Sequence, residues 1–533
     1  MGDNAVTFPP QPDPAVQETS FAADTSPPSE RDNSIQNDVG RNGYGSIPER
    51  STAPAEEGRK RPSTRALAPD LLRGLLMVLM ALDHNTMALK SWAHGTAIEG
   101  EADGVVVHEW NRPIAIVIRT LTHLCAPGFT FLLGMGLVYF GRSRTNLGWP
   151  AARMARHFLL RAVALTGVTI VMGLAVSAGQ IWFLNIVLFA LAVDYLLAGL
   201  LWLVISKTEQ SLAYFLLRML PEKAEDDPTE PLLQDREGME GAIAPDRTII
   251  RAADISWHVH NALLLALAVV AIWWNVWLSP TGGHCRHEQL PSASASWENT
   301  SEGGIWWRIW FHAVQSPHVV SGFPPMAWLS FAVLGLLYGR VILARSWTQK
   351  AIVAGNALSA AAFAVVFVLT RLLPGFGNLS RGCLQMSEQR EHPDTNQYLV
   401  SVPSFFYIIK YPPDVAFWSF TMAGNLLLLA LFGLIPSRIA SRIKVLLVYG
   451  TSALFFYVLH IFLLFALAVP VIAWLGHPVK DNDPWTGEPA VGVDQLWAFF
   501  GNWAVVLAIL YPLCRLYGNF KRTREPDSIW RFF

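Results

Sequence analysis

The sequence contains little charge of either sign. Lysine, arginine, aspartate and glutamate make up 15% of its 533 residues, whereas soluble domains hold about 25%. The formal net charge is −1, and no basic block is present to follow a phosphate backbone. We therefore expect neither a soluble enzyme nor a nucleic-acid-binding protein.

Cysteine is also scarce. The chain has four cysteines, and their spacing is unlike that of a structural zinc site. The stretch His284-Cys285-Arg286-His287 offers three possible ligands and no fourth. No bound metal is therefore predicted.

Apolar residues, by contrast, are abundant. They make up 52% of the chain, with 21 tryptophans and 29 phenylalanines among them. A soluble fold of this length has no core large enough to bury so much apolar surface. The composition predicts an all-α, polytopic membrane protein.

The first 65 residues differ from the rest. Only 15 of them are apolar and nine are prolines, so this segment cannot offset the entropy of ordering. It also lacks the apolar core of a signal peptide. We expect residues 1–65 to form a disordered cytosolic tail. Within it, Gly43-Tyr44-Gly45-Ser46-Ile47 has the form of a tyrosine-based sorting signal, which suits a lysosome or vacuole.

Beyond the tail, apolar runs long enough to cross about 30 Å of hydrocarbon recur ten times. The predicted transmembrane helices cover 69–92, 113–140, 156–178, 180–205, 259–280, 324–343, 350–373, 412–436, 445–475 and 493–517. Together they form a membrane domain over residues 66–520, followed by a short C-terminal segment, 521–533.

The distribution of basic residues predicts the orientation. Four clusters fall on the same side when the helix count is ten, and the positive-inside rule makes that side cytosolic. The clusters are Arg142, Arg144, Arg153 and Arg156; Arg340, Arg345 and Lys350; Arg438, Arg442 and Lys444; and Lys521, Arg522 and Arg524. Both termini and an insertion at 207–258 are then cytosolic, and the loops 281–322 and 375–411 are lumenal.

The predicted lumenal loops carry features of an oxidising, glycosylating compartment. Asn299 and Asn378 each begin an N-glycosylation sequon. Cys285 and Cys383 lie in separate loops on this side, where a disulfide between them is expected. Two free thiols are the alternative.

The first predicted helix contains polar residues that are costly in a membrane. Arg73 and His84 are eleven residues apart, which places them about 20° apart around a helix, and Asp83 adjoins His84. We expect His84 to act as a base that Asp83 orients. The alternative is that Arg73 reaches the headgroups and His84 marks the membrane interface.

Other helices and loops contribute further candidates. Arg119 and His123 are four residues apart on one face of the second helix, and His460 lies within the ninth. These three side chains are equally compatible with hydrogen bonds that merely hold helices together. His108 lies in the first predicted lumenal loop, in His108-Glu109-Trp110-Asn111.

Five stretches carry a further signal, and in sequence order they are Leu71-Leu72-Arg73-Gly74 with Asp83-His84, Leu121-Thr122-His123-Leu124-Cys125-Ala126-Pro127-Gly128-Phe129, Lys410-Tyr411-Pro412-Pro413, Phe455-Phe456-Tyr457-Val458-Leu459-His460 and Tyr511-Pro512-Leu513-Cys514-Arg515. They resemble the heparan-alpha-glucosaminide N-acetyltransferase family of transmembrane acyltransferases. The resemblance covers the membrane domain. The tail and the 207–258 insertion have no recognised counterpart.

The resemblance implies an enzyme that moves an acetyl or other acyl group from cytosolic acetyl-CoA to a lumenal or extracellular glycan. A histidine would serve as general base or acyl carrier. The expected catalytic residues are His84, Asp83, Arg73, His123 and, by similarity of its loop, His108. Arg119 and His460 are the candidates for contact with acyl-CoA.

Two other functions fit the same residues. A transporter or permease would use the intramembrane Arg, His and Asp side chains as a substrate or proton path. A relative that has lost catalysis would keep only the fold. The expected partners are membrane lipid and a glycan acceptor, with a homodimer possible, in an endomembrane or the plasma membrane.

Overall fold

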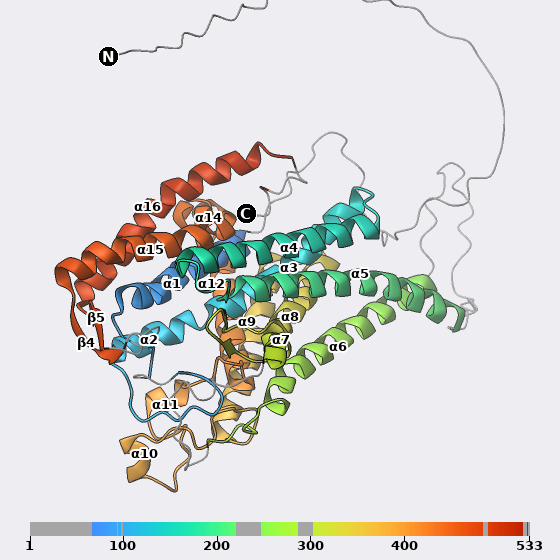
Figure 1. The fold of residues 1–533 in the computed structure, drawn as a ribbon. Helices are drawn as coiled ribbons and strands as arrows, with labels where there is room; N and C mark the ends of the chain where they lie inside the picture. The colour runs from blue at the N-terminus through green and yellow to red at the C-terminus, as the bar shows by residue number, and fades with distance from the viewer. Residues whose placement is uncertain are drawn as a thin grey trace, which may run out of the picture. The chain divides into compact units, whose positions relative to one another are not determined.

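The computed structural model describes residues 67–92, 94–96, 100–219, 247–285, 302–482, 489–525 and 530. The predicted tail, its sorting signal and Asn299 lie outside the described residues. Helices dominate the described chain, and its five strands have six residues or fewer (Figure 1). The protein is therefore an all-α polytopic membrane protein.

Nine helical spans in the described chain are long and apolar enough to cross a membrane. The first of them joins two consecutive helices, α2 (Pro113–Thr122) and α3 (Cys125–Asn146). The others are α4 (Ala151–Val176), α5 (Leu188–Met219), α6 (Arg247–Trp277), α8 (Pro325–Ala344), α9 (Gln349–Leu372), α12 (Val415–Leu434), α15 (Ala453–Leu475) and α16 (Leu496–Arg522). They correspond to nine of the ten predicted helices.

The remaining predicted helix, the first in the sequence, is α1 (Leu67–Leu89), which is not among these nine. It packs against α15, α16, α3, α12 and a short helix, α14 (Lys444–Thr451). Because neighbouring helices surround α1, its polar side chains meet protein groups instead of lipid.

Several boundaries differ from the prediction. The second predicted helix breaks at His123 and Leu124, just before Pro127, whose ring and missing N–H disfavour a continuous helix. The ninth divides into α14 and α15 at Ser452. The predicted insertion at 207–258 is partly helical, since α5 continues to Met219 and α6 begins at Arg247.

The connecting segments hold the remaining elements. α5 begins later than predicted because β1 (Phe183–Asn185) precedes it. β1 pairs in parallel with β3 (Val319–Ser321), and β3 pairs antiparallel with β2 (Val314–Gln315). β4 (His477–Asn482) and β5 (Pro489–Gly492) form a hairpin between α15 and α16. The short helices are α7 (Glu302–Phe311), α10 (Ser387–Glu391), α11 (Val402–Phe406) and α13 (Ser437–Ala440). Of these, α10 and α11 lie beyond the ends of the long helices (Figure 1).

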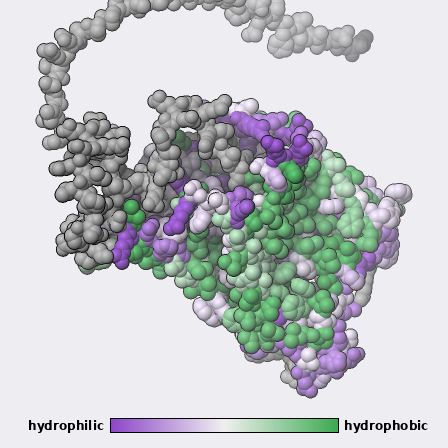
Figure 2. Space-filling model, turned by 180° about the vertical axis from the view of Figure 1, so that it is seen from behind, coloured by the Kyte–Doolittle hydropathy of each residue, from purple (hydrophilic) through white to green (hydrophobic). Residues whose placement is uncertain are grey.

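The outer surface is suited to contact with lipid. Figure 2 shows a face that is broadly hydrophobic, with hydrophilic residues gathered at its edges. Exposed apolar side chains lie along the outer helices, among them Val163 and Val171 on α4, Leu358 and Val365 on α9, and Val469 on α15. In water this surface would be unstable, whereas in a bilayer it needs no further cover.

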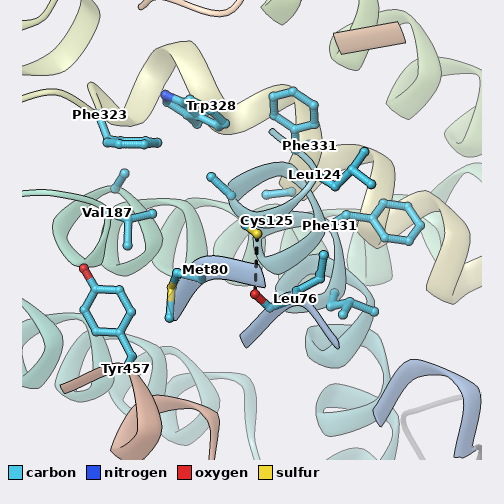
Figure 3. Close-up of a cluster of buried hydrophobic side chains, with 14 of the residues drawn as sticks. Leu76, Met80, Leu124, Cys125, Phe131, Val187, Phe323, Trp328, Phe331 and Tyr457 are labelled. Carbon is cyan, nitrogen blue, oxygen red and sulfur yellow. Dashed lines mark hydrogen bonds between the residues drawn. The ribbon is translucent and has the colours of Figure 1, made fainter. Parts of the chain in front are cut away.

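The centre of the bundle is tightly packed. Leu76, Met80 and Phe131 lie in one buried cluster, and the Cys125 thiol donates to the Leu76 carbonyl over 3.4 Å (Figure 3). α3 and α8 approach each other backbone to backbone at Gly134 and Gly335. A Cβ atom at either glycine would overlap a carbonyl oxygen of the facing helix. Small residues allow such close packing in membranes.

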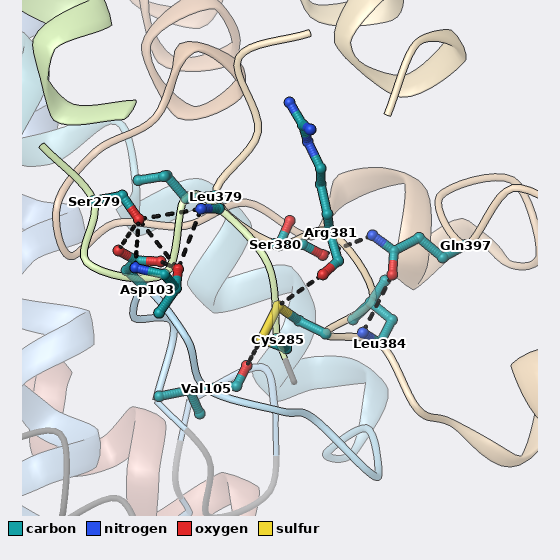
Figure 4. The surroundings of a disulfide bond; sticks show 12 residues. Asp103, Val105, Ser279, Cys285, Leu379, Ser380, Arg381, Leu384 and Gln397 are labelled. Atoms are coloured by element: carbon teal, nitrogen blue, oxygen red, sulfur yellow. Dashed lines mark hydrogen bonds between the residues drawn. A yellow bond between two sulfur atoms is a disulfide. The ribbon is translucent and has the colours of Figure 1, made fainter. Parts of the chain in front are cut away.

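A disulfide joins two of the loops. For Cys285 and Cys383 the sequence allowed either a disulfide or two free thiols. In the structure they form a disulfide, although they are 98 residues apart in the chain. Nearby, the hydroxyls of Ser279 and Thr281 each donate to Asp103 over 2.6 Å (Figure 4). These contacts tie the segment before α2 to the loop after α6 and to the segment between α9 and α12.

Asn378 lies in the same region and is fully buried. Its amide nitrogen donates to the carbonyl oxygens of Thr370 and Pro374, and its amide oxygen accepts from Arg371. A glycan on this nitrogen is incompatible with the folded loop. The glycosylation predicted at Asn378 is therefore corrected, because a sequon carries no information about burial.

Candidate active site

Asp83, in the last two turns of α1, faces α2. Its carboxylate accepts a hydrogen bond of 2.9 Å from the Thr122 hydroxyl and forms an ion pair of 3.3 Å with Arg119. Adjacent residues of a helix point about 100° apart, so Asp83 and His84 face different neighbours. The expected orientation of His84 by Asp83 is therefore wrong.

Glu101 is the centre of the polar cluster beside α2. Arg119 donates to Glu101 Oε2 from Nε over 2.8 Å, and its Nη2 lies 2.6 Å from the same oxygen. His123 Nε2 lies 2.9 Å from it as well. The spacing of four residues places Arg119 and His123 on one face of the helix end, where both meet this carboxylate.

Arg119 offsets part of the negative charge in this cluster. Burial acts to raise the pKa of Glu101, but Arg119 and His123 outweigh it and hold that pKa well below its usual range. Glu101 is therefore ionised, and the Arg119 guanidinium is shared between two carboxylates. The printed contacts of Arg119 are with these two carboxylates, and its predicted contact with acyl-CoA stays a prediction.

His84 is paired with His460 of α15. His84 Nδ1 lies 2.8 Å from His460 Nε2, and His460 Nδ1 lies 3.1 Å from the carbonyl oxygen of Phe456. A carbonyl only accepts, so His460 Nδ1 carries the proton and, in the neutral ring, His460 Nε2 is the acceptor. His84 Nδ1 must then donate. The neutral His84 ring therefore has its lone pair on Nε2.

This geometry changes the role of His460. It was expected to contact acyl-CoA, but it is fully buried in α15, and its ring meets that of His84 edge to edge, with 18° between the ring planes and 5.1 Å between the centroids. His460 therefore positions the His84 ring and fixes its tautomer, as an orienting group does for a general base.

His94 and Lys410 also lie beside the cluster. Burial lowers the pKa of His94 to about 4, and Arg119 acts in the same direction. His94 is therefore neutral near pH 7. The backbone N–H of Lys410 donates to the carbonyl of Glu101 over 3.1 Å, which brings the segment before α12 to the cluster.

Two predicted catalytic residues lie elsewhere. Arg73 pairs with Asp70 at 3.1 Å and lies eleven residues, about 16 Å of helix, from His84. His108 is exposed, and the described structure shows no contact between it and the polar cluster. Neither residue therefore adjoins the His84 ring, although both were expected to act with it.

A narrow cleft of about 20 Å³ adjoins the cluster on the side of α11. Its lining includes Glu101, Arg119 and His123 from the cluster, with Trp110 and Tyr407 beside them. In the part of the chain that the structure describes, no three His, Cys, Asp or Glu side chains form a metal-binding group.

Glu101, Thr122 and Lys410 were not singled out by their chemistry in the sequence. Glu101 and Lys410 lie in loops, where no helical periodicity reports a shared face. Thr122 adjoins His123 but is an ordinary helix residue. Thr122 and Lys410 do lie in stretches that resemble a known family, but nothing in those stretches set them apart from their neighbours.

A comparison with protein-family models and with curated proteins finds no match to this chain.

Proposed function

We propose that this protein is a membrane-embedded acyltransferase. It would move an acetyl or other acyl group from cytosolic acyl-CoA to an amine or hydroxyl of a glycan on the lumenal or extracellular side. The observation that carries the proposal is the His84–His460 pair, in which a buried histidine orients a second one and leaves its Nε2 as a base. The resemblance of five stretches to transmembrane acyltransferases supports it.

Acyl transfer requires a base for the attacking amine or hydroxyl. His84 Nε2 meets that need, since imidazole takes and returns protons near neutral pH. His460 supports the charged form by accepting the Nδ1 hydrogen bond. The partly buried Asp83 carboxylate adjoins His84 in the chain and adds a negative charge near the imidazolium as it forms.

Acyl-CoA must meet the protein at two places. Its phosphates suit guanidinium groups at the predicted cytosolic end of the bundle, where the Arg73 side chain is 26% exposed. Its thioester must reach His84 near the other end of α1. Arg73 therefore fits coenzyme binding better than the catalytic role it was first given.

The location follows from the same proposal. The Cys285–Cys383 disulfide favours an oxidising compartment on the side of the membrane where these two loops lie. Both termini would then lie on the opposite, cytosolic side. We propose an endomembrane such as the vacuole or lysosome, or the plasma membrane. Lipid surrounds the outer helices, and a homodimer remains part of the proposal.

The test is an acyl-transfer assay with purified full-length protein, radiolabelled acetyl-CoA and a mixed glycan acceptor. His84→Ala should lower kcat by about 10²–10⁴-fold, the usual contribution of a general base. His392→Ala is the matched control, because His392 is an exposed histidine in the segment before α11. Equal activity of wild type and His84→Ala would refute the role of His84.

A proton-coupled transporter is the second candidate, favoured by Asp194 of α5. This carboxylate is fully buried, and neither of its oxygens has a hydrogen-bond partner among the described residues. Unpaired carboxylates inside membranes often bind protons. Substrate or proton uptake by protein vesicles without acyl-CoA, abolished in Asp194→Asn, would favour the transporter. A catalytically inactive relative would show neither activity.

A further inference from the structure

Lys410 is held in the polar cluster by its backbone. It lies between α11 and α12, and the N–H groups of Lys410 and Tyr411 both donate to the carbonyl oxygen of Glu101, at 3.1 and 3.2 Å. Asp103 N–H donates in return to the Tyr411 carbonyl over 3.1 Å. The residue whose carboxylate binds Arg119 and His123 therefore also fixes the position of Lys410.

The Lys410 side chain is buried, and its ammonium has no polar partner among the described residues. The residue is 6% exposed, and its ammonium lies 5.3 Å from the ring centroids of Phe323 and of Tyr411. The described chain offers this ammonium neither a hydrogen bond nor an ion pair. Aromatic faces attract a cation, but they leave its three N–H donors unused. Buried charges are normally paired, so these donors are available to an acceptor on a bound molecule.

The other charges of the cluster do not supply that acceptor. The carboxylates of Asp83 and Glu101 are both engaged by Arg119, and Thr122 donates to Asp83 as well. Lys410 is nevertheless close enough to act electrostatically on Asp83 and on the His84 ring. Its ammonium is thus an uncommitted cation near the proposed base.

We propose that Lys410 binds the carbonyl oxygen of the acyl group and stabilises the oxyanion that forms there during transfer. This proposal rests on the acyltransferase function. Arg119 is a weaker choice for this role because two carboxylates already share its charge. Arg73 is excluded by its distance along α1.

The proposed transfer takes place in two stages. The acceptor nitrogen or oxygen attacks the thioester carbon, its proton passes to His84 Nε2, and the carbonyl electron pair moves to the oxygen. The Lys410 ammonium donates a hydrogen bond to that oxyanion. When the carbonyl re-forms, the carbon–sulfur bond breaks, and the thiolate of coenzyme A takes the proton from His84. Lys410 keeps its proton throughout.

The experiment compares wild type with Lys410→Met, Lys410→Gln and Lys410→Arg in the full-length protein. We expect Lys410→Met to lower kcat by about 10²–10³-fold, as loss of one oxyanion donor does, with little change in KM for acetyl-CoA. Lys410→Gln and Lys410→Arg retain donors and should recover part of kcat. Lys350→Met is the control, since Lys350 is exposed at the start of α9.

Thermal unfolding and binding of radiolabelled acetyl-CoA are measured on each variant. If Lys410→Met does not fold, the kcat of folded Lys410→Gln decides instead. A folded Lys410→Met that keeps the wild-type kcat, or a folded Lys410→Gln that does so where Lys410→Met does not fold, overturns the role of Lys410 and leaves the acyltransferase intact. A wild type that neither binds acetyl-CoA nor transfers its acetyl group overturns the proposed function, and the role of Lys410 with it.

Discussion

His84 Nδ1 and His460 Nε2 lie 2.8 Å apart although 376 residues separate them in the chain. The contact brings the end of α1 against the middle of α15. The Phe456 carbonyl determines which nitrogen of His460 holds the proton, and His460 in turn determines which nitrogen of His84 is basic. Two helices and one backbone carbonyl thus set the protonation pattern of the proposed base.

His460 should matter for rate more than for binding. His460→Ala removes the acceptor of the His84 Nδ1 proton, so the basic nitrogen of His84 is no longer specified. We expect kcat to fall by about 10²-fold with little change in KM for acetyl-CoA. His460→Gln retains an acceptor oxygen and should recover part of the loss. A loss confined to KM would argue that His460 contacts the coenzyme.

Glu101 should be important for stability. Glu101→Gln leaves the buried Arg119 with one carboxylate fewer, and breaking a buried ion pair costs about 3–5 kcal/mol. The expected result is a lower Tm of the detergent-solubilised protein. Glu391→Gln, a change at an exposed acid of α10, is the control and should leave Tm unchanged.

The pKa of Glu101 also predicts how stability depends on pH. In the folded protein the pKa of Glu101 lies below its value of about 4.3 in the unfolded chain. The stability that ionised Glu101 contributes is therefore fully present above that pH and is lost as the pH falls through the pKa of Glu101 in the folded protein. Wild type should therefore keep this contribution at pH 5. Below roughly pH 4 the difference in Tm between wild type and Glu101→Gln should shrink. A difference that shrinks between pH 7 and 5 would contradict the ionised pair.

The close contact between α3 and α8 should leave no room for a side chain at Gly335. Gly335→Ala places a Cβ against the Phe131 carbonyl and should greatly reduce the yield of folded protein. Gly136→Ala is the matched control, because it lies on α3 with open space at its Cβ and should stabilise the helix by up to about 1 kcal/mol. Size-exclusion profiles of the two variants provide the comparison.

Glycosylation tests both topology and burial. With Asn378 buried and hydrogen-bonded, glycan is expected only at Asn299 of the two predicted sites. Asn299→Gln should therefore abolish the mobility shift produced by glycosidase, and Asn378→Gln should leave it intact. A shift that survives in Asn299→Gln would contradict the burial of Asn378, and no shift in wild type would leave the lumenal assignment of this loop without support.

Much of the fold could be predicted from the sequence, because a run of apolar residues reports a membrane span without knowledge of its neighbours. The polar residues within such runs, such as His84 and His460, could be found for the same reason. Their partners could not. The pairing of His84 with His460 in place of Asp83 depends on how α1 packs against α15.

Loop residues of the site were still harder to predict. Glu101 lies in a segment without periodicity, and its importance follows only from the convergence of Arg119 and His123 on one oxygen. The burial of Asn378 likewise depends on Arg371 and on packing that no local pattern reports. Contacts between distant segments decide all these cases.

The most direct test of the central claim is transfer of an acyl group across a bilayer. Full-length protein is reconstituted in vesicles, with acetyl-labelled acetyl-CoA outside and a mixture of amino sugars and neutral glycans trapped inside. The proposed function predicts label on the trapped acceptor with wild-type protein and its loss with His84→Ala. Unlabelled acceptor in vesicles that contain folded wild-type protein would contradict the proposed function.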